Sequence, residues 1–155
     1  MPLHAIQVEI SPGDLIDRLT ILEIKAARIR ERAKRQQVRD ELRRLREIHD
    51  AAFGPGTSPD LARLATELRA VNESLWEVED QLRVCERGRD FGDRFVQLAR
   101  SVYRQNDRRA ALKNQINRLL GSPLREEKSY PAWEDRPGSG PDKGDGASTR
   151  PACSG

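Results

Sequence analysis

The chain has 155 residues with a formal net charge of +3, and 36% of its residues are hydrophobic. No apolar run approaches the roughly 20 residues that a transmembrane helix needs, and residues 1–10 lack the basic start and apolar core of a signal peptide. We therefore expect a cytoplasmic protein without a membrane span. Cys85 falls in a helical pattern and Cys153 near the end of the chain, which disfavours a structural disulfide. The two histidines give no metal-ligand pattern, so we expect no metal site.

Composition divides the chain into two parts near residue 130. Residues 131–155 include nine Pro or Gly among 25 positions and almost no apolar side chain. Such a segment cannot bury enough apolar surface to offset the entropy lost on ordering, so we expect a disordered tail. Residues 1–130 are sufficient for one domain of ordinary size.

Two helices are predicted in the first third of the chain. Ser11, Pro12 and Asp14 provide an N-cap, a proline at the first helical position and an acid in the first turn. The helix that starts there is predicted to run to about Lys34, and because apolar residues surround most of it, it should pack on two sides. A second helix is predicted over 36–52. A weak alternation in residues 4–10 is compatible with a short edge strand or an extended lead-in.

A heptad pattern over residues 60–87 is the clearest signal in the sequence. Its apolar residues alternate between spacings of three and four: Leu61, Leu64, Leu68, Val71, Leu75, Val78, Leu82 and Cys85. This pattern predicts one long helix whose apolar stripe lies in the core, ended by Gly88. A fourth helix is predicted over 91–120, with Leu112, Ile116 and Leu119 inward. Helices joined by short links predict an all-α, antiparallel up-down bundle of about four helices.

Polar side chains keep helical spacing beside the apolar stripes of three of these helices. They are Asp17 and Arg28 on the first helix, Asn72, Trp76 and Glu79 on the third, and Tyr103, Asn106 and Lys113 on the fourth. Packing the stripes together carries these rows towards one another, so we predict that all eight line one concavity. Such a set suits a small anionic ligand or a partner segment. The alternative is a buried network that fixes the register of the helices.

The acids Glu77, Glu79 and Asp80 raise the question of a cation site. Two acids three residues apart resemble half of the magnesium site of helical nucleotide pyrophosphohydrolases. That family needs a second acidic pair on a facing helix, and only scattered acids are available upstream. We therefore favour a solvated helix face.

The positive charge of the chain is concentrated in a basic band, residues 25–46. The band contains ten Lys or Arg and three Asp or Glu, a local balance of +7. Phosphate contact needs only such charge, but no aromatic is interleaved with it and no known nucleic-acid-binding signature is present. We therefore expect no specific nucleic-acid binding.

Four sequence blocks resemble one bacterial family of small all-helical proteins of unknown function. The blocks are SPGDLIDRLTILEIK from Ser11, VNESLW from Val71, ARSVYRQND from Ala99 and EEKSY from Glu126. The resemblance covers nearly everything from Ile6 to Tyr130. It implies no established activity and no catalytic residue, and it suggests a link with cell-envelope polysaccharide assembly.

Two functions remain open from the sequence. The first is a cytoplasmic binding or accessory protein whose polar inter-helix site takes a small anionic ligand or a protein partner. The alternative is a small helical enzyme acting on a phosphorylated or nucleotide-sugar substrate. No motif names a reaction, so the cofactor is left unknown, and the oligomeric state is not readable.

Overall fold

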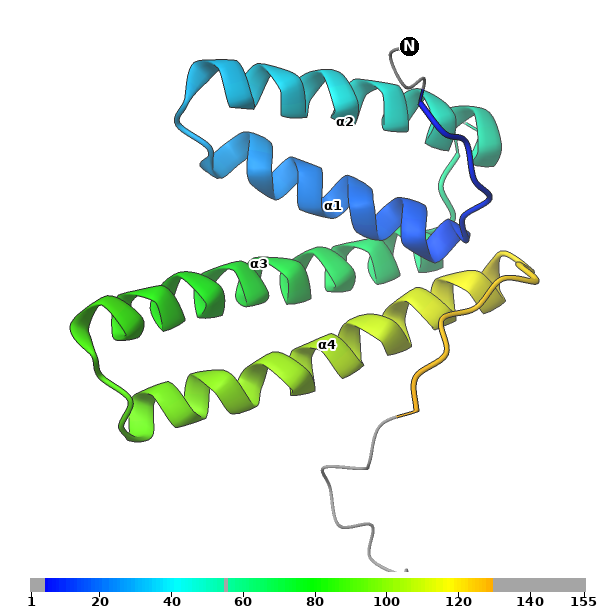
Figure 1. The fold of residues 1–155 in the computed structure, drawn as a ribbon. Helices are drawn as coiled ribbons and strands as arrows, with labels where there is room; N and C mark the ends of the chain where they lie inside the picture. The colour runs from blue at the N-terminus through cyan, green and yellow to red at the C-terminus, as the bar shows by residue number, and fades with distance from the viewer. Residues whose placement is uncertain (1–4, 55, 130–155) are drawn as a thin grey trace, which may run out of the picture.

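The structure, a computed structural model, describes residues 5–54 and 56–129 and contains four α-helices in that part of the chain (Figure 1). They are α1 (Pro12–Arg28), α2 (Arg32–Phe53), α3 (Pro59–Gly88) and α4 (Asp93–Leu119). Figure 1 shows two antiparallel hairpins, α1–α2 and α3–α4, stacked so that α1 lies between α2 and the α3–α4 pair. The predicted all-α up-down bundle is confirmed. The tail predicted for residues 131–155 lies outside the described residues.

The helix α1 has two apolar faces because it packs against α2 on one side and against the second hairpin on the other. Leu15, Leu19 and Leu22 form one buried cluster with Leu42 of α2. Ile16 points to the other side and joins a second buried cluster with residues of α3 and α4. The prediction that the first helix packs on two sides is therefore confirmed.

The heptad stripe of α3 forms most of the second cluster. The residues of α3 in it are Leu61, Leu64, Leu68 and Val71, and they pack with Leu112 and Ile116 of α4. Further along α3, Val78 and Cys85 are buried, whereas Leu75 and Leu82 are half-buried. The α3–α4 hairpin extends beyond the end of α1 in Figure 1, so its far end has fewer neighbours, and Phe91 there is 51% exposed.

Several helix boundaries differ from those predicted. The first helix ends at Arg28 instead of Lys34, because Ile29 adopts an extended backbone (φ −72°, ψ 122°) and the chain reverses direction before α2 begins. The long helix α3 includes Gly88, and the left-handed residue that ends it is Arg89 (φ 50°). Residues 5–10 form no strand, and Leu119 is 44% exposed instead of inward.

Candidate functional site

A buried polar network joins α1, α3 and α4. The Asp17 carboxylate, on a residue only 5% exposed, accepts hydrogen bonds from Arg109 Nε (2.8 Å, to Oδ1) and Arg109 Nη2 (2.5 Å, to Oδ2). Asn72 Nδ2 donates to Asp17 Oδ1 and to Thr20 Oγ1, at 2.9 Å each. The Thr20 hydroxyl in turn donates to the Asp17 carbonyl oxygen at 2.8 Å. The network therefore ties three helices to one carboxylate.

The charges in this network are matched. A buried carboxylate is costly unless it is paired and hydrogen-bonded, and Arg109 supplies both the counter-charge and a two-pronged contact. The hydrogen bonds to Asp17 raise the pKa of Arg109 above its ordinary value and outweigh burial, which acts in the opposite direction. The Arg109 guanidinium is therefore charged and held in one orientation.

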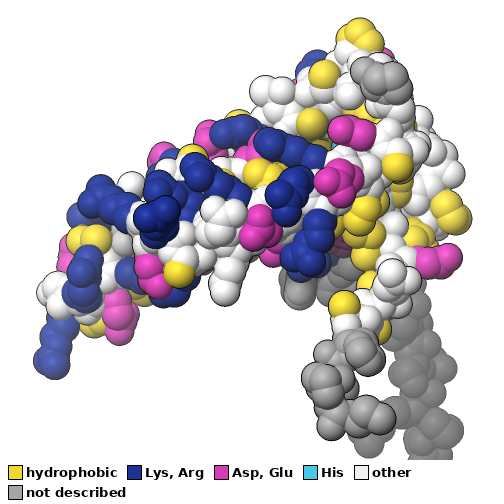
Figure 2. All heavy atoms as spheres, turned by 90° about the horizontal axis from the view of Figure 1, so that it is seen from above, with side chains coloured by type: hydrophobic (Ala, Val, Ile, Leu, Met, Phe, Trp, Pro, Cys, Tyr) yellow, Lys and Arg dark blue, Asp and Glu magenta, His cyan; other side chains and the backbone are white. Residues whose placement is uncertain are grey.

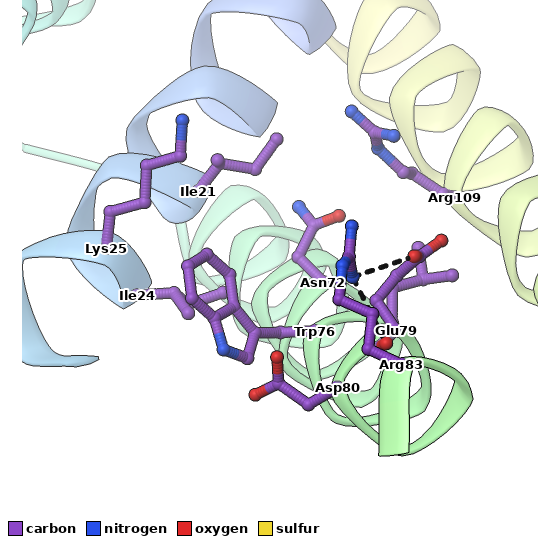
Figure 3. A pocket seen from close by; sticks show the side chains of 10 residues that line it. Ile21, Ile24, Lys25, Asn72, Trp76, Glu79, Asp80, Arg83 and Arg109 are labelled. Atoms are coloured by element: carbon purple, nitrogen blue, oxygen red, sulfur yellow. Dashed lines mark hydrogen bonds and ion pairs between the residues drawn. The ribbon is translucent and has the colours of Figure 1, made fainter. Parts of the chain in front are cut away.

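A groove of about 440 Å³ opens beside this network, between α1, α3 and α4 (Figure 3). The residues that line it are Ile21, Ile24, Lys25, Asn72, Leu75, Trp76, Glu79, Asp80, Arg83 and Arg109. Its volume lies in the range of small-molecule sites, on the order of 300–1,000 Å³. We refer to it as the inter-helix groove.

Cations from three helices meet at the inter-helix groove. Lys25 comes from α1, Arg83 from α3 and Arg109 from α4 (Figure 3). Arg83 is paired with Glu79 of its own helix at 3.1 Å, whereas Lys25 makes no ion pair within the described residues. Trp76 supplies a flat, largely apolar wall, and the carboxylates of Glu79 and Asp80 line the groove as well, so the groove combines apolar surface with charges of both signs.

The structure brings four of the eight predicted site residues together at this groove. Asn72, Trp76 and Glu79 line it. Asp17 lies beneath them and holds both Asn72 and Arg109. These four come from the predicted rows of the first and third helices.

The other four predicted residues are not among those that line the inter-helix groove. Arg28, at the end of α1, pairs with Glu77 at 3.0 Å. Tyr103 is 40% exposed, and its pKa is lowered chiefly by a hydrogen bond with Arg100.

Asn106 and Lys113 of α4 also lie elsewhere. The backbone oxygen of Asn106 accepts a hydrogen bond from Lys128 Nζ at 3.0 Å, and Lys113 belongs to a separate cluster. The residues of α4 that bond to α1 are Arg109, Lys113 and Asn117. Tyr103 and Asn106 precede all three in α4 and so lie before the region where α4 contacts α1.

The separate cluster lies at the start of α1. Lys113 Nζ, on a residue 8% exposed, lies 2.9 Å from Asp14 Oδ1 and also contacts the Glu126 carboxylate. The backbone of Glu126 is itself fixed by the Asn114 side chain, through hydrogen bonds of 2.8 and 3.0 Å. Residues after α4 are thereby attached to α4.

Burial and hydrogen bonding shift the pKa values of Lys113 and Asp14 in opposite directions. For each residue the hydrogen bonds together outweigh burial. Burial alone would lower the pKa of Lys113, but the hydrogen bonds with Glu126 and Asp14 raise it above its ordinary value. Burial alone would raise the pKa of Asp14, but the hydrogen bonds from Lys113 and Ser11 lower it. Asp14 and Lys113 are therefore both held in their ionised forms, which is typical of a structural ion pair.

Sequence reasoning missed Arg109 and Lys25 as site residues, and it recognised Arg83 only as a member of the polar row of Asn72, Trp76 and Glu79, not as one of the eight residues predicted to line the site. Arg109 interrupts the apolar row of α4, and a charged residue in an inward row is a signal for a buried partner. Arg83 continues the spacing of Trp76 and Glu79 along α3. Lys25 had no signal of its own, because its place in the groove depends on how α1 crosses α3.

The basic band remains largely unpaired in the fold. Arg30, Arg32, Arg35, Arg39 and Arg44 make no ion pair within the described residues. Figure 2 shows Lys and Arg side chains gathered on the left of the face seen from above, the side on which α2 begins and the α3–α4 hairpin turns in Figure 1. The absence of specific nucleic-acid binding stays a prediction.

The described residues contain neither a metal-binding cluster nor a helix that could span a membrane. In that part of the chain, no group of three or more His, Cys, Asp or Glu side chains is arranged to hold a metal ion. None of the helices there has the length and apolar character needed to cross a membrane. Of the acids considered for a cation site, Glu77 is paired with Arg28 and Glu79 with Arg83.

Comparison with known proteins places the chain in a family. The model of a family of unknown function, DUF6165, matches residues 6–143, a range that includes all four helices and the inter-helix groove. The match runs past the domain boundary expected at residue 130. No curated protein and no solved structure matches the chain. Because the matched range covers most of its length, the chain belongs to DUF6165, a family of unknown function.

Proposed function

We propose that this protein is a binding or accessory protein whose inter-helix groove receives a small anionic ligand. The observation that carries the proposal is the convergence of Lys25, Arg83 and Arg109 on one groove from three different helices. Because Arg109 is held by the buried carboxylate of Asp17, its orientation does not have to be fixed again when a ligand binds. Such pre-organisation lowers the entropic cost of binding.

The apolar part of the groove adds to the affinity that charge alone would provide. Ile21, Ile24 and Trp76 line the same space as the three cations. A ligand with an anionic group and an apolar or flat body buries both parts there. Charged contacts are also stronger in a partly enclosed groove than on an open surface, because water screens them less.

The proposal also concerns the cellular process in which the protein acts. The resemblance of four sequence blocks to a bacterial family suggests a cytoplasmic role in cell-envelope polysaccharide assembly, with a protein partner that handles the same ligand. Affinity purification of the full chain from its source, with the partner identified by mass spectrometry, tests this part. Recovery of a glycosyltransferase in stoichiometric amount is the expected result. Its absence, under conditions that retain other complexes, contradicts the proposed role in cell-envelope polysaccharide assembly.

Nuclear magnetic resonance tests the ligand site directly, since a 17.6 kDa chain gives resolved spectra. Inorganic pyrophosphate is titrated into the ¹⁵N-labelled protein at physiological salt. We expect saturable shifts at the Trp76 indole and at the amides near Asn72 and Arg109. Lys25→Met should weaken binding, while Lys34→Met, which removes the same charge outside the groove, should not. Equal weakening by both variants, or no saturation below about 10 mM, contradicts the proposal.

A small enzyme acting on a phosphorylated or nucleotide-sugar substrate is the second candidate, because the Glu79 and Asp80 carboxylates line the same groove. An enzyme would need one of them as an acid, a base or a cation ligand. Turnover of a sugar phosphate that depends on a divalent cation and is abolished by Glu79→Gln or Asp80→Asn would favour the enzyme over the binding protein.

A further inference from the structure

The Asn72 side chain presents a fixed acceptor to the inter-helix groove. Its Nδ2 donates to Asp17 Oδ1 and to Thr20 Oγ1 at 2.9 Å each. The Asp17 carboxylate, when ionised, can only accept, so the amide nitrogen must face it and the amide oxygen must point away. Asn72 is 6% exposed and lines the groove, and its Oδ1 has no hydrogen-bond partner among the described residues.

Arg109 presents a fixed donor next to this acceptor. Its Nε and Nη2 are both bonded to Asp17, while Nη1 makes no hydrogen bond within the part of the chain that the structure describes. Asn72 Nδ2 and Arg109 Nε approach the same Asp17 oxygen, at 2.9 and 2.8 Å. The amide and the guanidinium therefore meet at one carboxylate oxygen, and both residues line the groove (Figure 3).

Asn72 Oδ1 is an acceptor that is open to the groove, so a ligand hydroxyl can donate to it without displacing any protein contact. The neighbouring Arg109 Nη1 can donate to an anionic group on the same ligand, although Asp17 already balances the charge of this guanidinium. Trp76 lies beside Asn72 in Figure 3, with Arg109 on the far side of Asn72, and offers a flat face to a ring. Lys25, which makes no ion pair within the described residues, also lines the groove and supplies a further positive charge for the anion, whereas Arg83 is paired with Glu79.

We infer that the ligand is a phosphorylated sugar: a ring hydroxyl donates to Asn72 Oδ1, the phosphate binds Arg109, and the ring lies on Trp76. This inference rests on the proposed anion-binding function and specifies its ligand. A simple anion would offer no donor to Asn72 Oδ1, and a neutral sugar would offer no counter-charge to Lys25, which makes no ion pair within the described residues. The sugar phosphate is either free or part of a nucleotide sugar, since both carry the same groups.

Fluorescence of Trp76 tests the inference. The chain contains two tryptophans, so Trp133→Phe leaves Trp76 as the only one. This protein is titrated separately with methyl phosphate, glucose 1-phosphate, uridine diphosphate glucose and uridine 5′-monophosphate. We expect glucose 1-phosphate to bind about 3- to 10-fold more tightly than methyl phosphate, as one added hydrogen bond allows, and to change the Trp76 emission.

The four probes separate the sources of the ligand. Tighter binding of uridine diphosphate glucose than of glucose 1-phosphate supports the sugar phosphate and places it in a nucleotide sugar; the reverse order supports the free form. Tighter binding of uridine 5′-monophosphate than of either glucose compound would assign the Trp76 wall to a base and overturn the inference.

A matched pair of variants tests the role of Asn72. Asn72→Ala should remove the preference for glucose 1-phosphate over methyl phosphate, whereas Asn106→Ala, which truncates a carboxamide outside the groove, should retain it. If Asn72→Ala does not fold, the affinities of the Trp133→Phe protein for glucose 1-phosphate and methyl phosphate still test the inference, because equal affinities contradict it. Pyrophosphate binding that depends on Lys25, without any preference between these probes, overturns this inference and leaves the proposed function standing. Failure of every anion to bind overturns both.

Discussion

Gly13 of α1 and Lys113 of α4 approach each other so closely that no side chain fits between the helices. A β-carbon at Gly13 would lie 2.5 Å from the Lys113 carbonyl oxygen and 2.9 Å from Asn117 Oδ1. The close approach allows the Gly13 amide to donate to Asn117 Oδ1 at 2.7 Å, although Asn117 is fully buried. This contact positions α1 on α4 at the end of α1 that also carries Asp14 and Asp17.

Gly13→Ala should therefore destabilise the fold, because the backbone of α4 cannot move away without separating the two helices. We expect a loss of about 1–3 kcal/mol in the free energy of unfolding, as for other over-packed sites. Urea denaturation measures it. Gly88→Ala is the matched control, since a β-carbon there meets nothing within 4 Å and helix propensity favours alanine. Similar stabilities for both variants would show that α1 and α4 can separate without cost.

The apolar pattern predicted the fold because it repeats over whole helices. Eight heptad positions in α3 agree with one another, so a single misplaced residue such as Leu119 does not change the result. The boundary of α1 could not be predicted in the same way. Residues 29–31 include no glycine or proline, and the chain turns there because α2 must return along the Leu15 face of α1.

The candidate site was predictable only where helix spacing and helix packing agree. Asn72, Trp76 and Glu79 share one face of α3, and that face borders the groove. In α4 the corresponding row contains both Tyr103 and Lys113, about ten residues or 15 Å apart along the helix. A row of that length extends beyond the region where α4 contacts α1. The extent of that contact cannot be predicted from the spacing of residues within one helix.

The residues that follow α4 provide a second prediction. A chain that ends after residue 130 should keep its stability, because 131–155 resembles a disordered segment in composition. A chain that ends after Pro123 should lose about 1–3 kcal/mol, because Lys113 then loses Glu126, one of its two acidic partners. Chemical denaturation of both truncated chains, with one ending after residue 143 as a reference, measures the difference. An equal loss in both would place the stabilising contacts beyond residue 130.

The ion pair at the start of α1 predicts a pH dependence. Hydrogen bonds from Lys113 and Ser11 hold the pKa of Asp14 below its ordinary value of 3.8, against the effect of burial. A lowered pKa in the folded state means that the contribution of Asp14 is complete above its unfolded pKa and is lost as the pH falls towards the folded one. The stability difference between the unaltered protein and Asp14→Asn should thus be constant from about pH 5 to 7 and shrink below about pH 4.

Urea denaturation of both proteins at a series of pH values measures this difference. The control is Lys113→Met, in which the main partner of Asp14 is gone. In that background, Asp14→Asn should change the pH dependence much less. A difference that grows as the pH falls would reverse the sign and show that the ionised carboxylate destabilises the fold.

The network around Asp17 and the surface pair of Glu79 should respond differently to removal of a charge. Asp17→Asn keeps the shape of the side chain but leaves the half-buried Arg109 without its counter-charge, so we expect a loss of about 1–3 kcal/mol. Glu79→Gln breaks a solvent-exposed pair with Arg83 one helical turn away, which should cost no more than about 0.5 kcal/mol. Thermal and urea unfolding measure both.

If the same Glu79→Gln variant loses pyrophosphate binding while it stays folded, Glu79 acts in the groove. If Asp17→Asn changes neither stability nor binding, the carboxylate does not hold Arg109 in place, and the pre-organised anion site does not exist.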